Sequence, residues 1–383
     1  MTTITEGKAK IDIQISDIPS KKMEVFYNPR MEHNRTISIQ FYDFWAREIE
    51  KSENLVFIDG MAASGIKGIR VLTETDVNKV IFNDINPKSI DNIRINVKNS
   101  KLPKNKTFEL LSMSFQQLLT QKYENIFSNA LKLPPAPLDT PKQQYIVDLD
   151  PFGSPVPYLD FVLANVQQNT LISVTATDTA VLCGASQQNS TKCKRTYLAT
   201  PLKNEFMKET GLRILLGYIA RTAAKYGHFP QFLLTYSKDH YLRAFFSVDK
   251  YKLGSLDNKI GYISFCAVCN KRKILFEQFS SHICECRGKL SIAGPLWLGN
   301  LIDLTFFSKL EANKQKYNLL YEFMKPMASE QDFPPWHYNL HNYEWCAHKK
   351  IDQALREING ARSHFDPLAI KTNNIKLFEK EKV

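Results

Sequence analysis

The sequence lacks several features that would place it in a special class of protein. No run of about 18 apolar residues, the length that a membrane-spanning helix needs, occurs in the 383 residues. The first residues, MTTITEGKAKIDIQ, have neither the apolar core of a secretory signal nor the arginine-rich helix of a transit peptide. With 15 glycines and 18 prolines, the chain is neither collagenous nor of low complexity. We therefore expect a globular protein of the cytoplasm that does not bind membranes.

Cysteine is scarce, and its placement is informative. There are seven cysteines, an odd number, and four of them fall within residues 266–286. In a reducing compartment such crowding indicates a metal site rather than disulfides. Cys183, Cys193 and Cys346 have no partner at ligand spacing, so we expect them to be ordinary thiols.

Positive charge, in contrast, is in excess. Fifty Lys and Arg side chains against 39 Asp and Glu give a formal net charge of +11. That balance favours a polyanionic partner, nucleic acid before a membrane surface. The length and the ordinary hydrophobic content of 43% fit two compact domains. We expect the protein to act as a monomer.

Short apolar runs recur through the first 180 residues and predict five buried strands. These strands are predicted at residues 55–59, 79–84, 107–111, 144–150 and 170–178. A glycine-rich turn and a helix follow the first strand, and Pro87 opens a helix after the second. Residues 202–225 have a helical pattern, and the runs 229–236 and 241–248 predict an antiparallel pair at the sheet edge. The pattern predicts an α/β fold with a mixed, mostly parallel, doubly wound sheet.

A polar stretch containing Gly, Asp and Asn at residues 249–260 marks the predicted domain boundary. We expect a cofactor-binding domain at 1–250 and a smaller C-terminal domain at 251–383. A zinc-ribbon-like segment is predicted at 261–291 within the second domain. The proline-rich residues 129–143 are predicted to form a surface loop.

The turn after the first strand has the composition of a nucleoside site. Its glycines follow the spacing G-x4-G-x2-G, and Asp84 ends the next strand 19 residues after Gly65. In a parallel sheet such glycines allow the backbone to approach a ligand, and the acid accepts the ribose hydroxyls. We predict a nucleoside cofactor bound by Asp59, Gly60, Ser64, Gly65 and Asp84. The alternative is that the glycines serve only tight packing of the helix on the strand.

The motif Asp150-Pro151-Phe152-Gly153 at the end of the fourth strand suggests the chemistry. An exocyclic amine is a poor nucleophile because its lone pair is delocalised into the ring. A carboxylate followed by proline supplies two hydrogen-bond acceptors, a side chain and a backbone carbonyl, aimed at one NH2 group. The adjacent aromatic ring can stack on a flipped base. The arrangement is typical of amino-methyltransferases, although the same four residues also occur in purely structural turns.

Several long strings resemble the tRNA (guanine-26-N2) dimethyltransferase family, in its archaeal form. They are EGKAKI from residue 6, FYNPRMEHNR from 26, DGMAASGIKGIR from 59, ND from 83, DLDPFGSP from 148, TATDTAVLCG from 175, DHYLRAF from 239, GPLWLG from 294 and SHFDPLAIKT from 363. The resemblance covers nearly the whole chain. It implies a class I, Rossmann-like methyltransferase fold with S-adenosylmethionine as methyl donor. It further implies that one or two methyl groups pass to the exocyclic N2 of guanine 26 in tRNA.

The resemblance assigns catalytic roles by position. Asp150 is the catalytic carboxylate, assisted by the carbonyl of Pro151. Phe26 and Phe152 sandwich the target guanine, with core packing as the alternative for Phe26. Because no cysteine lies near this motif, we expect direct transfer of the methyl group without a covalent enzyme intermediate.

The resemblance also assigns residues to the donor site. Arg35 would reach the carboxylate of the methionine moiety, for which a planar guanidinium fork is well suited. Lys67 stands where the family usually has arginine. Met113 and Ser114 stand where members carry an acid that contacts the adenine, so adenine recognition there would fall to backbone groups.

Two cysteine pairs open the predicted C-terminal domain. Cys266 and Cys269 form a C-x2-C knuckle, and Cys284 and Cys286 form a C-x-C pair after fourteen intervening residues. We predict a zinc ion held by these four thiolates, with His282 as the alternative to Cys284. Four protein ligands leave no position for water, so the zinc would be structural. Four reduced thiols in a hairpin are the other interpretation.

Basic residues gather within 187–228, and we predict that they bind tRNA phosphates together with the C-terminal domain. They are Lys192, Lys194, Arg195, Lys203, Lys208, Arg213, Arg221 and Lys225. A solvated helix face is the alternative. The aromatic-rich residues 333–348 include His337, His341 and His348, for which core or tRNA-stacking roles are expected rather than a metal.

Two other functions stay under consideration. One is a catalytically inactive tRNA-binding protein on the same fold, which the departures at Lys67 and Met113 would favour. The other is a nicotinamide oxidoreductase, which the glycine spacing and the Asp150 motif disfavour.

Overall fold

The computed structural model describes residues 2–13, 23–50, 55–122, 144–277, 282–346 and 348–379. The loop predicted at 129–143 lies outside the described residues. The chain divides into two compact units. The first contains residues 1–175, 245–248 and 308–321, and the second contains 176–244, 249–307 and 322–383. Because the units interleave along the chain, the functional division predicted at residue 250 stays a prediction.

Five parallel strands form the centre of the first unit. They are β3 (Leu55–Asp59), β4 (Lys79–Asn83), β5 (Thr107–Leu111), β6 (Gln144–Leu149) and β7 (Leu171–Ala176). In β3 and β7 every side chain is buried, as expected for parallel strands covered on both faces. β3 lies between β4 and β6 and pairs in parallel with both.

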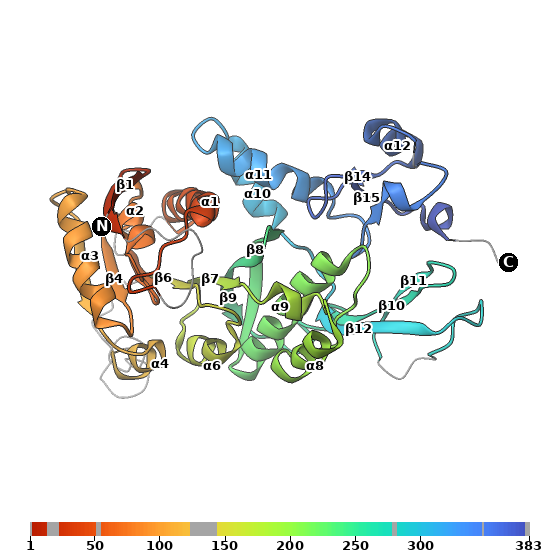
Figure 1. Cartoon of the computed structure of the whole chain (residues 1–383), viewed down its shortest axis with the longest axis horizontal. Helices are drawn as coiled ribbons and strands as arrows, with labels where there is room; N and C mark the ends of the chain where they lie inside the picture. Colours follow the sequence, from red (N-terminus) through yellow and green to blue (C-terminus); the bar gives the residue numbers. More distant parts are fainter. Residues whose placement is uncertain are drawn as a thin grey trace. The chain divides into compact units, whose positions relative to one another are not determined.

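Two further strands, β8 (His228–Lys238) and β9 (Tyr241–Lys250), complete the sheet. The strand order is β5-β4-β3-β6-β7-β9-β8. Only two residues connect β8 to β9, so these neighbours run antiparallel. The predicted mixed, mostly parallel sheet is thereby confirmed (Figure 1).

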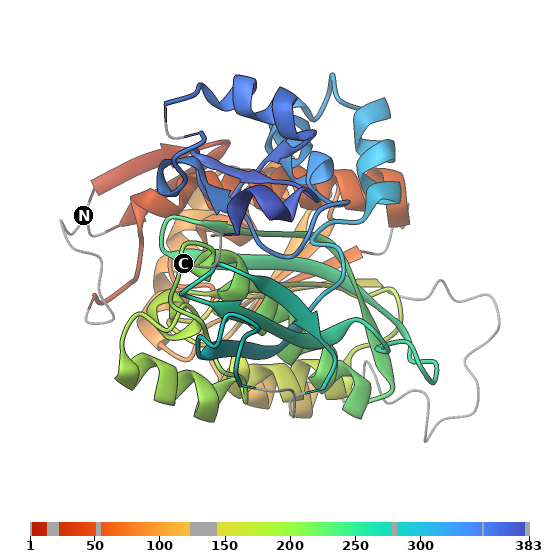
Figure 2. The same cartoon turned by 90° about the vertical axis from the view of Figure 1, so that its right-hand side faces the viewer.

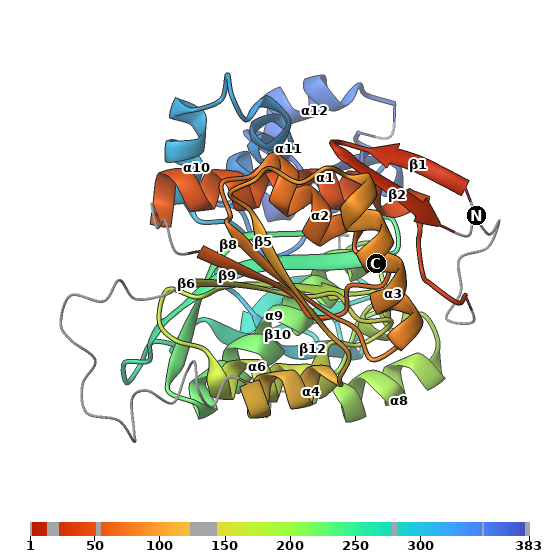
Figure 3. The same cartoon turned by 90° about the vertical axis from the view of Figure 1, so that its left-hand side faces the viewer.

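Helices cover both faces of the parallel strands. α1 (Glu32–Phe44) packs on α2 (Ile66–Glu74), which contacts α3 (Pro87–Asn99), and α4 (Phe115–Gln117) packs on α6 (Val156–Asn165). Figure 3 shows α1 and α2 on one side of the strands, with α4 and α6 on the other. α3 begins at Pro87 as predicted, with the Asn86 side chain accepting the backbone N–H of Lys88.

A β-hairpin that the sequence patterns did not predict precedes these elements. β1 (Thr2–Glu6) pairs antiparallel with β2 (Ala9–Ile13) around Gly7, whose φ is 57°. Side chains of α3 bind the backbone of β2: Asn96 accepts the N–H of Asp12 at 2.8 Å, and Asn92 donates to the Asp12 carbonyl at 3.0 Å. The hairpin is thereby tied to the helical face of the first unit.

The second unit combines helices with a three-stranded sheet. Its helices include α7 (Thr179–Leu182), α8 (Gln187–Thr196) and α9 (Met207–Lys225), the last beginning five residues later than predicted. The sheet has the order β11 (Arg272–Leu275), β10 (Ile260–Cys266), β12 (Leu290–Trp297) and is drawn in teal in Figure 2. β12 packs closely on α9, because a Cβ at Gly217 would lie 2.9 Å from the Leu296 backbone.

Short elements make up the rest of the chain. Two helices, α10 (Leu304–Ala312) and α11 (Asn318–Ser329), follow the three-stranded sheet, and α12 (Ile351–Ile358) lies near the C-terminus. A small sheet has the order β13 (Tyr338–Asn339), β15 (Ala369–Lys371), β14 (Ala361–Arg362). Among the described helices, none combines the length and apolarity that crossing a bilayer requires.

Candidate active site and metal centre

The glycine turn runs from the end of β3 to the start of α2, and packing alone already requires its glycines. A Cβ at Gly60 would lie 2.3 Å from the Phe115 ring, and one at Gly68 would lie 2.3 Å from the Phe82 ring. Gly65 has a φ of 76°, in the left-handed region that favours glycine. The packing interpretation therefore holds for these glycines, and the case for a nucleoside site depends on the residues around them.

Asp84 follows β4 and fixes the conformation of this turn. Its Oδ2 accepts the backbone N–H of Ala63 at 2.8 Å, and its Oδ1 accepts that of Asn86 at 2.9 Å. The side chain is partly exposed. Each carboxylate oxygen has a second lone pair, so Asp84 can still accept ribose hydroxyls at the carboxyl ends of the strands.

Acidic side chains crowd the adjacent strand ends. The parallel register sets Asp59 of β3 opposite Asp148 of β6. Complete burial raises the pKa of Asp59 to about 7; the ammonium of Lys67 opposes this shift, whereas Asp148 and Asp150 add to it. The Asp59 carboxylate also accepts the backbone N–H of Gly68 at 3.1 Å. The crowding was not anticipated, since it depends on strand register.

Lys67 lies in the first turn of α2 and joins the two acids of the β6 end. Its Nζ is 2.5 Å from Oδ2 of Asp148 and 2.6 Å from Oδ2 of Asp150. The side chains of Lys67 and Asp148 are 8% and 0% exposed, whereas that of Asp150 is 26% exposed. Asp150 therefore combines one ion-paired oxygen with a side that solvent can reach.

Arg35 is engaged by a carboxylate of the chain itself. Its Nε and Nη2 donate to the two oxygens of Glu6 at 2.7 and 2.5 Å, and its Nη1 donates to the Asn28 carbonyl at 3.1 Å. Although burial opposes it, Arg35 and Arg70 hold the pKa of Glu6 below its ordinary value. Glu6 occupies the fork that the resemblance assigns to the donor's carboxylate. The EGKAKI string was the only sequence signal for this acid.

Phe26 and Phe152 come together, although not as a sandwich. Their ring centroids are 4.4 Å apart and the ring planes meet at 79°, an edge-to-face contact. A base stacked between two rings needs them parallel and about 7 Å apart, twice the usual contact distance. Phe152 is 44% exposed. The rings must therefore separate before a base can enter between them.

Met113 and Ser114 contribute mainly through the backbone and a helix cap. The Met113 carbonyl accepts a hydrogen bond from the Asn83 amide at 3.1 Å, and the same amide reaches the Gly60 carbonyl at 3.0 Å. Ser114 and Gln117 form a reciprocal capping box at the start of α4. Asn83 thus links the turn after β3 to the segment after β5, a role that only the fold reveals.

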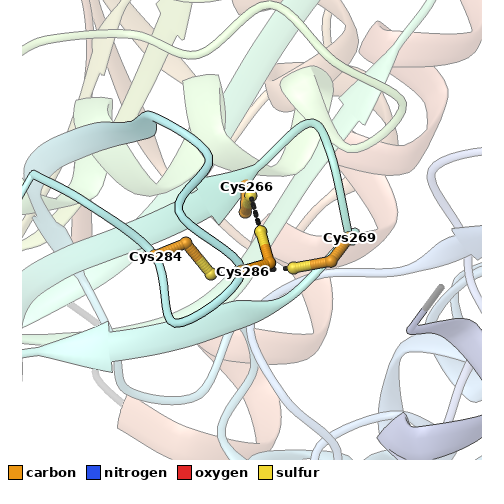
Figure 4. Close-up of side chains that lie close together, drawn as sticks. All are labelled: Cys266, Cys269, Cys284 and Cys286. Atoms are coloured by element: carbon orange, nitrogen blue, oxygen red, sulfur yellow. Dashed lines mark hydrogen bonds between the residues drawn. The ribbon is translucent and has the colours of Figure 1, made fainter. Parts of the chain in front are cut away.

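The four cysteines of the β10–β12 sheet converge. The sulfur atoms of Cys266, Cys269, Cys284 and Cys286 all lie within 4.8 Å of one another. Figure 4 shows the four side chains pointing toward one another from two turns. The Sγ atoms of Cys266 and Cys286 are 3.5 Å apart, and those of Cys269 and Cys284 are 3.6 Å apart. Tetrahedral zinc with bonds of 2.3 Å would place sulfurs about 3.8 Å apart.

The turns around the cysteines have backbone conformations that suit a metal knuckle. Asn270 and Arg287, each directly after a cysteine pair, have φ of 59° and 65°. The backbone N–H groups of Cys266 and Cys284 bind the carbonyls of Lys271 and Gly288, which closes both turns. His282 is exposed and does not belong to the cluster, so the geometry favours Cys284.

The basic residues predicted to bind phosphates divide into two groups. Arg213 is buried, pairs with Glu209 and donates to the carbonyls of Trp297 and Gly299; Arg221 donates to those of Gly217 and Tyr197. The other six are exposed: Lys192, Lys194, Arg195, Lys203, Lys208 and Lys225. Charge alone did not separate inward-facing arginines from surface lysines.

The histidines of 333–348 do not form a metal site among the described residues. His337 is buried, stacks on Phe365 and lies with its Nδ1 3.3 Å from Glu209. His341 and His348 are exposed. The expected core role therefore holds for His337.

Comparison with known proteins covers nearly the whole chain. The model of the N2,N2-dimethylguanosine tRNA methyltransferase family matches residues 7–378. The chain belongs to this family. The resemblance drawn from the sequence is thereby confirmed.

Individual relatives align with this chain over nearly their full length. The tRNA (guanine(26)-N(2))-dimethyltransferase of Methanobrevibacter smithii is 33% identical, covering 97% of this chain and 94% of its own. The tRNA (guanine(26)-N(2)/guanine(27)-N(2))-dimethyltransferase of Aquifex aeolicus is 31% identical, and the match covers 97% of this chain and 93% of that protein. A solved complex of Trm1 from Pyrococcus horikoshii with S-adenosyl-L-methionine superimposes with a TM-score of 0.78 at 29% identity, covering 99% and 100%.

Proposed function

We propose that this chain is an S-adenosylmethionine-dependent tRNA methyltransferase that transfers one or two methyl groups to the N2 of guanine 26. The observation that carries the proposal is the family match over residues 7–378 with the motif at Asp150 intact. The similar proteins are named as dimethyltransferases, and none of these findings favours the inactive tRNA-binding alternative.

The donor site is proposed at the carboxyl ends of β3, β4 and β5. Asp84 would accept the ribose hydroxyls, and the turn formed by Asp59, Gly60, Ser64 and Gly65 would supply the close backbone approach. The backbone at Met113 and Ser114 would border the adenine. Arg35 would contribute its positive charge while it remains held by Glu6. When bound, S-adenosylmethionine supplies a sulfonium methyl group, whose carbon–sulfur bond breaks as the bond to N2 forms.

Asp150 is proposed as the group that receives the amine. Its Oδ2 is paired with Lys67, and its side chain is 26% exposed, so a hydrogen bond from the guanine NH2 is feasible. The carbonyl of Pro151 would accept the second N–H. The proton lost from N2 passes to the Asp150 carboxylate. Phe26 and Phe152 would part to stack on the base, since they touch edge to face in the absence of RNA.

A structural zinc is proposed at Cys266, Cys269, Cys284 and Cys286. Four thiolates complete a tetrahedral site and leave no position for a reacting water. The zinc would hold the two turns of the β10–β12 sheet together and take no part in methyl transfer. Seven cysteines without a disulfide also agree with the reducing cytoplasm, where we propose that the protein works.

Methyl transfer to an unmodified tRNA transcript tests the proposed function. We expect label from S-adenosylmethionine in N2-methylguanosine or N2,N2-dimethylguanosine, and none in a transcript with adenine at position 26. Asp150→Asn should lower the rate by roughly 10²–10⁴-fold because it removes the proton acceptor. Asp91→Asn, an exposed acid on α3 paired only with Arg94 among the described residues, is the control and should keep full activity.

Two outcomes would contradict the proposal. Retained activity in Asp150→Asn would exclude that carboxylate as the acceptor. A wild-type protein that binds tRNA without labelling it would instead favour the inactive scaffold.

A further inference from the structure

The ammonium of Lys67 faces inward, toward Asp148 in β6 and Asp150 just after the strand. Residues 148 and 150 lie two positions apart at the end of a strand, so their side chains leave the same face of the sheet. Lys67 enters between them from the first turn of α2, 2.5 Å from one carboxylate and 2.6 Å from the other. The sequence resemblance assigned Lys67 to the donor site, but these contacts give it a different neighbour.

Asp148 is held firmly on its other side. Its Oδ1 accepts hydrogen bonds from the hydroxyls of Tyr42 at 2.9 Å and Ser173 at 2.7 Å, and these hydroxyls lie 2.7 Å from each other. Tyr42 and Ser173 are fully buried, and Asp148 is 1% exposed. The three residues come from α1, β7 and β6, so the position of Asp148 is determined by three packed elements.

The charge balance explains why a cation is needed at this place. Asp59, Asp148 and Asp150 surround Lys67, whose ammonium is near enough to each to act on it. Without the ammonium, the Asp148 and Asp150 carboxylates would repel each other across a poorly solvated gap. Asp150, which is the more exposed of the two, would then turn away from the strand end.

We propose that Lys67 is a positioning residue for methyl transfer: anchored by Asp148, Tyr42 and Ser173, it holds the Asp150 carboxylate where the target amine must meet it. This inference rests on the proposed function and deepens it, because it assigns Lys67 to the acceptor side of the reaction. A positioned carboxylate matters because a displacement of about 1 Å can cost on the order of 10²-fold in rate.

A kinetic experiment separates positioning from donor binding. Lys67→Met alone would leave Asp148 buried without its cation, so the variant to use is Lys67→Met combined with Asp148→Asn, which removes both charges. We expect kcat for tRNA methylation to fall about 10²-fold, while the Kd for S-adenosylmethionine in calorimetry stays within about threefold. Asp148→Asn alone loses part of the anchor but keeps the ammonium beside Asp150, so its kcat should lie well above that of the combined variant. Lys67→Arg, the conservative replacement, keeps a cation there and should hold kcat within about fivefold of the wild type. A Kd that rises as much as kcat/KM falls, with kcat unchanged, would make Lys67 a donor contact and overturn the proposal.

A second experiment does not depend on turnover. In the Asp148→Asn background, the melting temperature is measured for Lys67→Met, for Asp150→Asn and for both together. If Lys67 holds Asp150, the combined loss should fall short of the summed losses by about 3 °C. Additive losses would overturn the inference. A wild-type protein that methylates no tRNA would refute the proposed function alone, since non-additive melting would still support the link between the two residues.

Discussion

Asp59, Asp148 and Asp150 gather around the single ammonium of Lys67, and this crowding decides how the strand ends respond to pH. Burial raises the pKa of Asp59 to about 7, with Lys67 opposing the shift and the two other carboxylates adding to it. In the unfolded chain the same group titrates near its ordinary pKa of about 3.9. The folded protein therefore binds this proton more tightly than the unfolded chain does.

The sign of the effect on stability follows from that difference. The favourable contribution of the Asp59 proton is fully present below pH 4 and is lost as pH rises through about 7. Asp59→Asn cannot lose the proton, so between pH 5 and pH 8 it should gain up to about 3 kcal/mol in unfolding free energy relative to the wild type. Urea denaturation of the ligand-free protein at four pH values measures this. A difference between the two proteins that does not change with pH would contradict the raised pKa.

Among the elements, the β10–β12 sheet shows how turns assemble a site. Neither cysteine pair can hold a metal alone, and the antiparallel pairing of β10 with both neighbours brings the two turns together. On the exposed surface of the same sheet, Glu285 lies 2.7 Å from Lys271 and 2.8 Å from Lys273. These exposed ion pairs join the same turns, but in water they contribute little compared with a metal.

Metal content distinguishes the two ligand sets predicted for this sheet. The purified protein should contain about one zinc per chain, and Cys284→Ser should lose most of it because three ligands remain. His282→Asn is the matched control, and it should keep the metal because His282 is exposed and outside the cluster. Native mass spectrometry measures both. A chelator should also lower the melting temperature of the wild type. Zinc lost from His282→Asn and kept in Cys284→Ser would reverse the assignment.

At the scale of the whole molecule, the formal net charge is +11, but only cations that face the solvent can bind phosphates. Lys192, Lys194 and Arg195 are exposed on α8, where the charge of Lys192 also acts on the Asp178 carboxylate. Arg213 and Arg221 contribute to the formal charge but bind carbonyls and Glu209 inside the second unit. The part of the charge that can reach phosphates is therefore smaller than the composition suggests.

Salt dependence tests whether α8 binds tRNA. Reversing Lys192, Lys194 and Arg195 to glutamate should weaken binding and reduce the slope of log K against log salt by about two to three, because each lost phosphate contact removes roughly 0.7–0.9. Fluorescence titrations at several salt concentrations measure the slope. The matched control reverses Lys98, Lys101 and Lys104, which are exposed in the first unit. Equal changes in both triple variants would indicate a general effect of net charge and not a contact of α8.

Much of the fold could be predicted because local patterns carry it. The five parallel strands and the helix starting at Pro87 follow from hydrophobic runs and from the preference for proline at a helix start. The β1–β2 hairpin was not predicted because β1 is mostly polar and exposed, so it lacks the continuous apolar run that marks a buried strand such as β3. The ion pairs of Glu6 were not predicted either, since its partners Arg35 and Arg70 are distant from it in the sequence.

The sequence by itself determined the family, the sheet and the identity of the chemical groups, because long motifs and apolar periods are properties of neighbouring residues. Only the tertiary structure decided which groups meet. Strand register placed Asp59 opposite Asp148, and the docking of α2 brought Lys67 between Asp148 and Asp150. The same packing set Glu6 into the fork of Arg35 and closed Phe26 onto Phe152. Such contacts depend on distances between segments far apart in the chain, which local patterns do not encode.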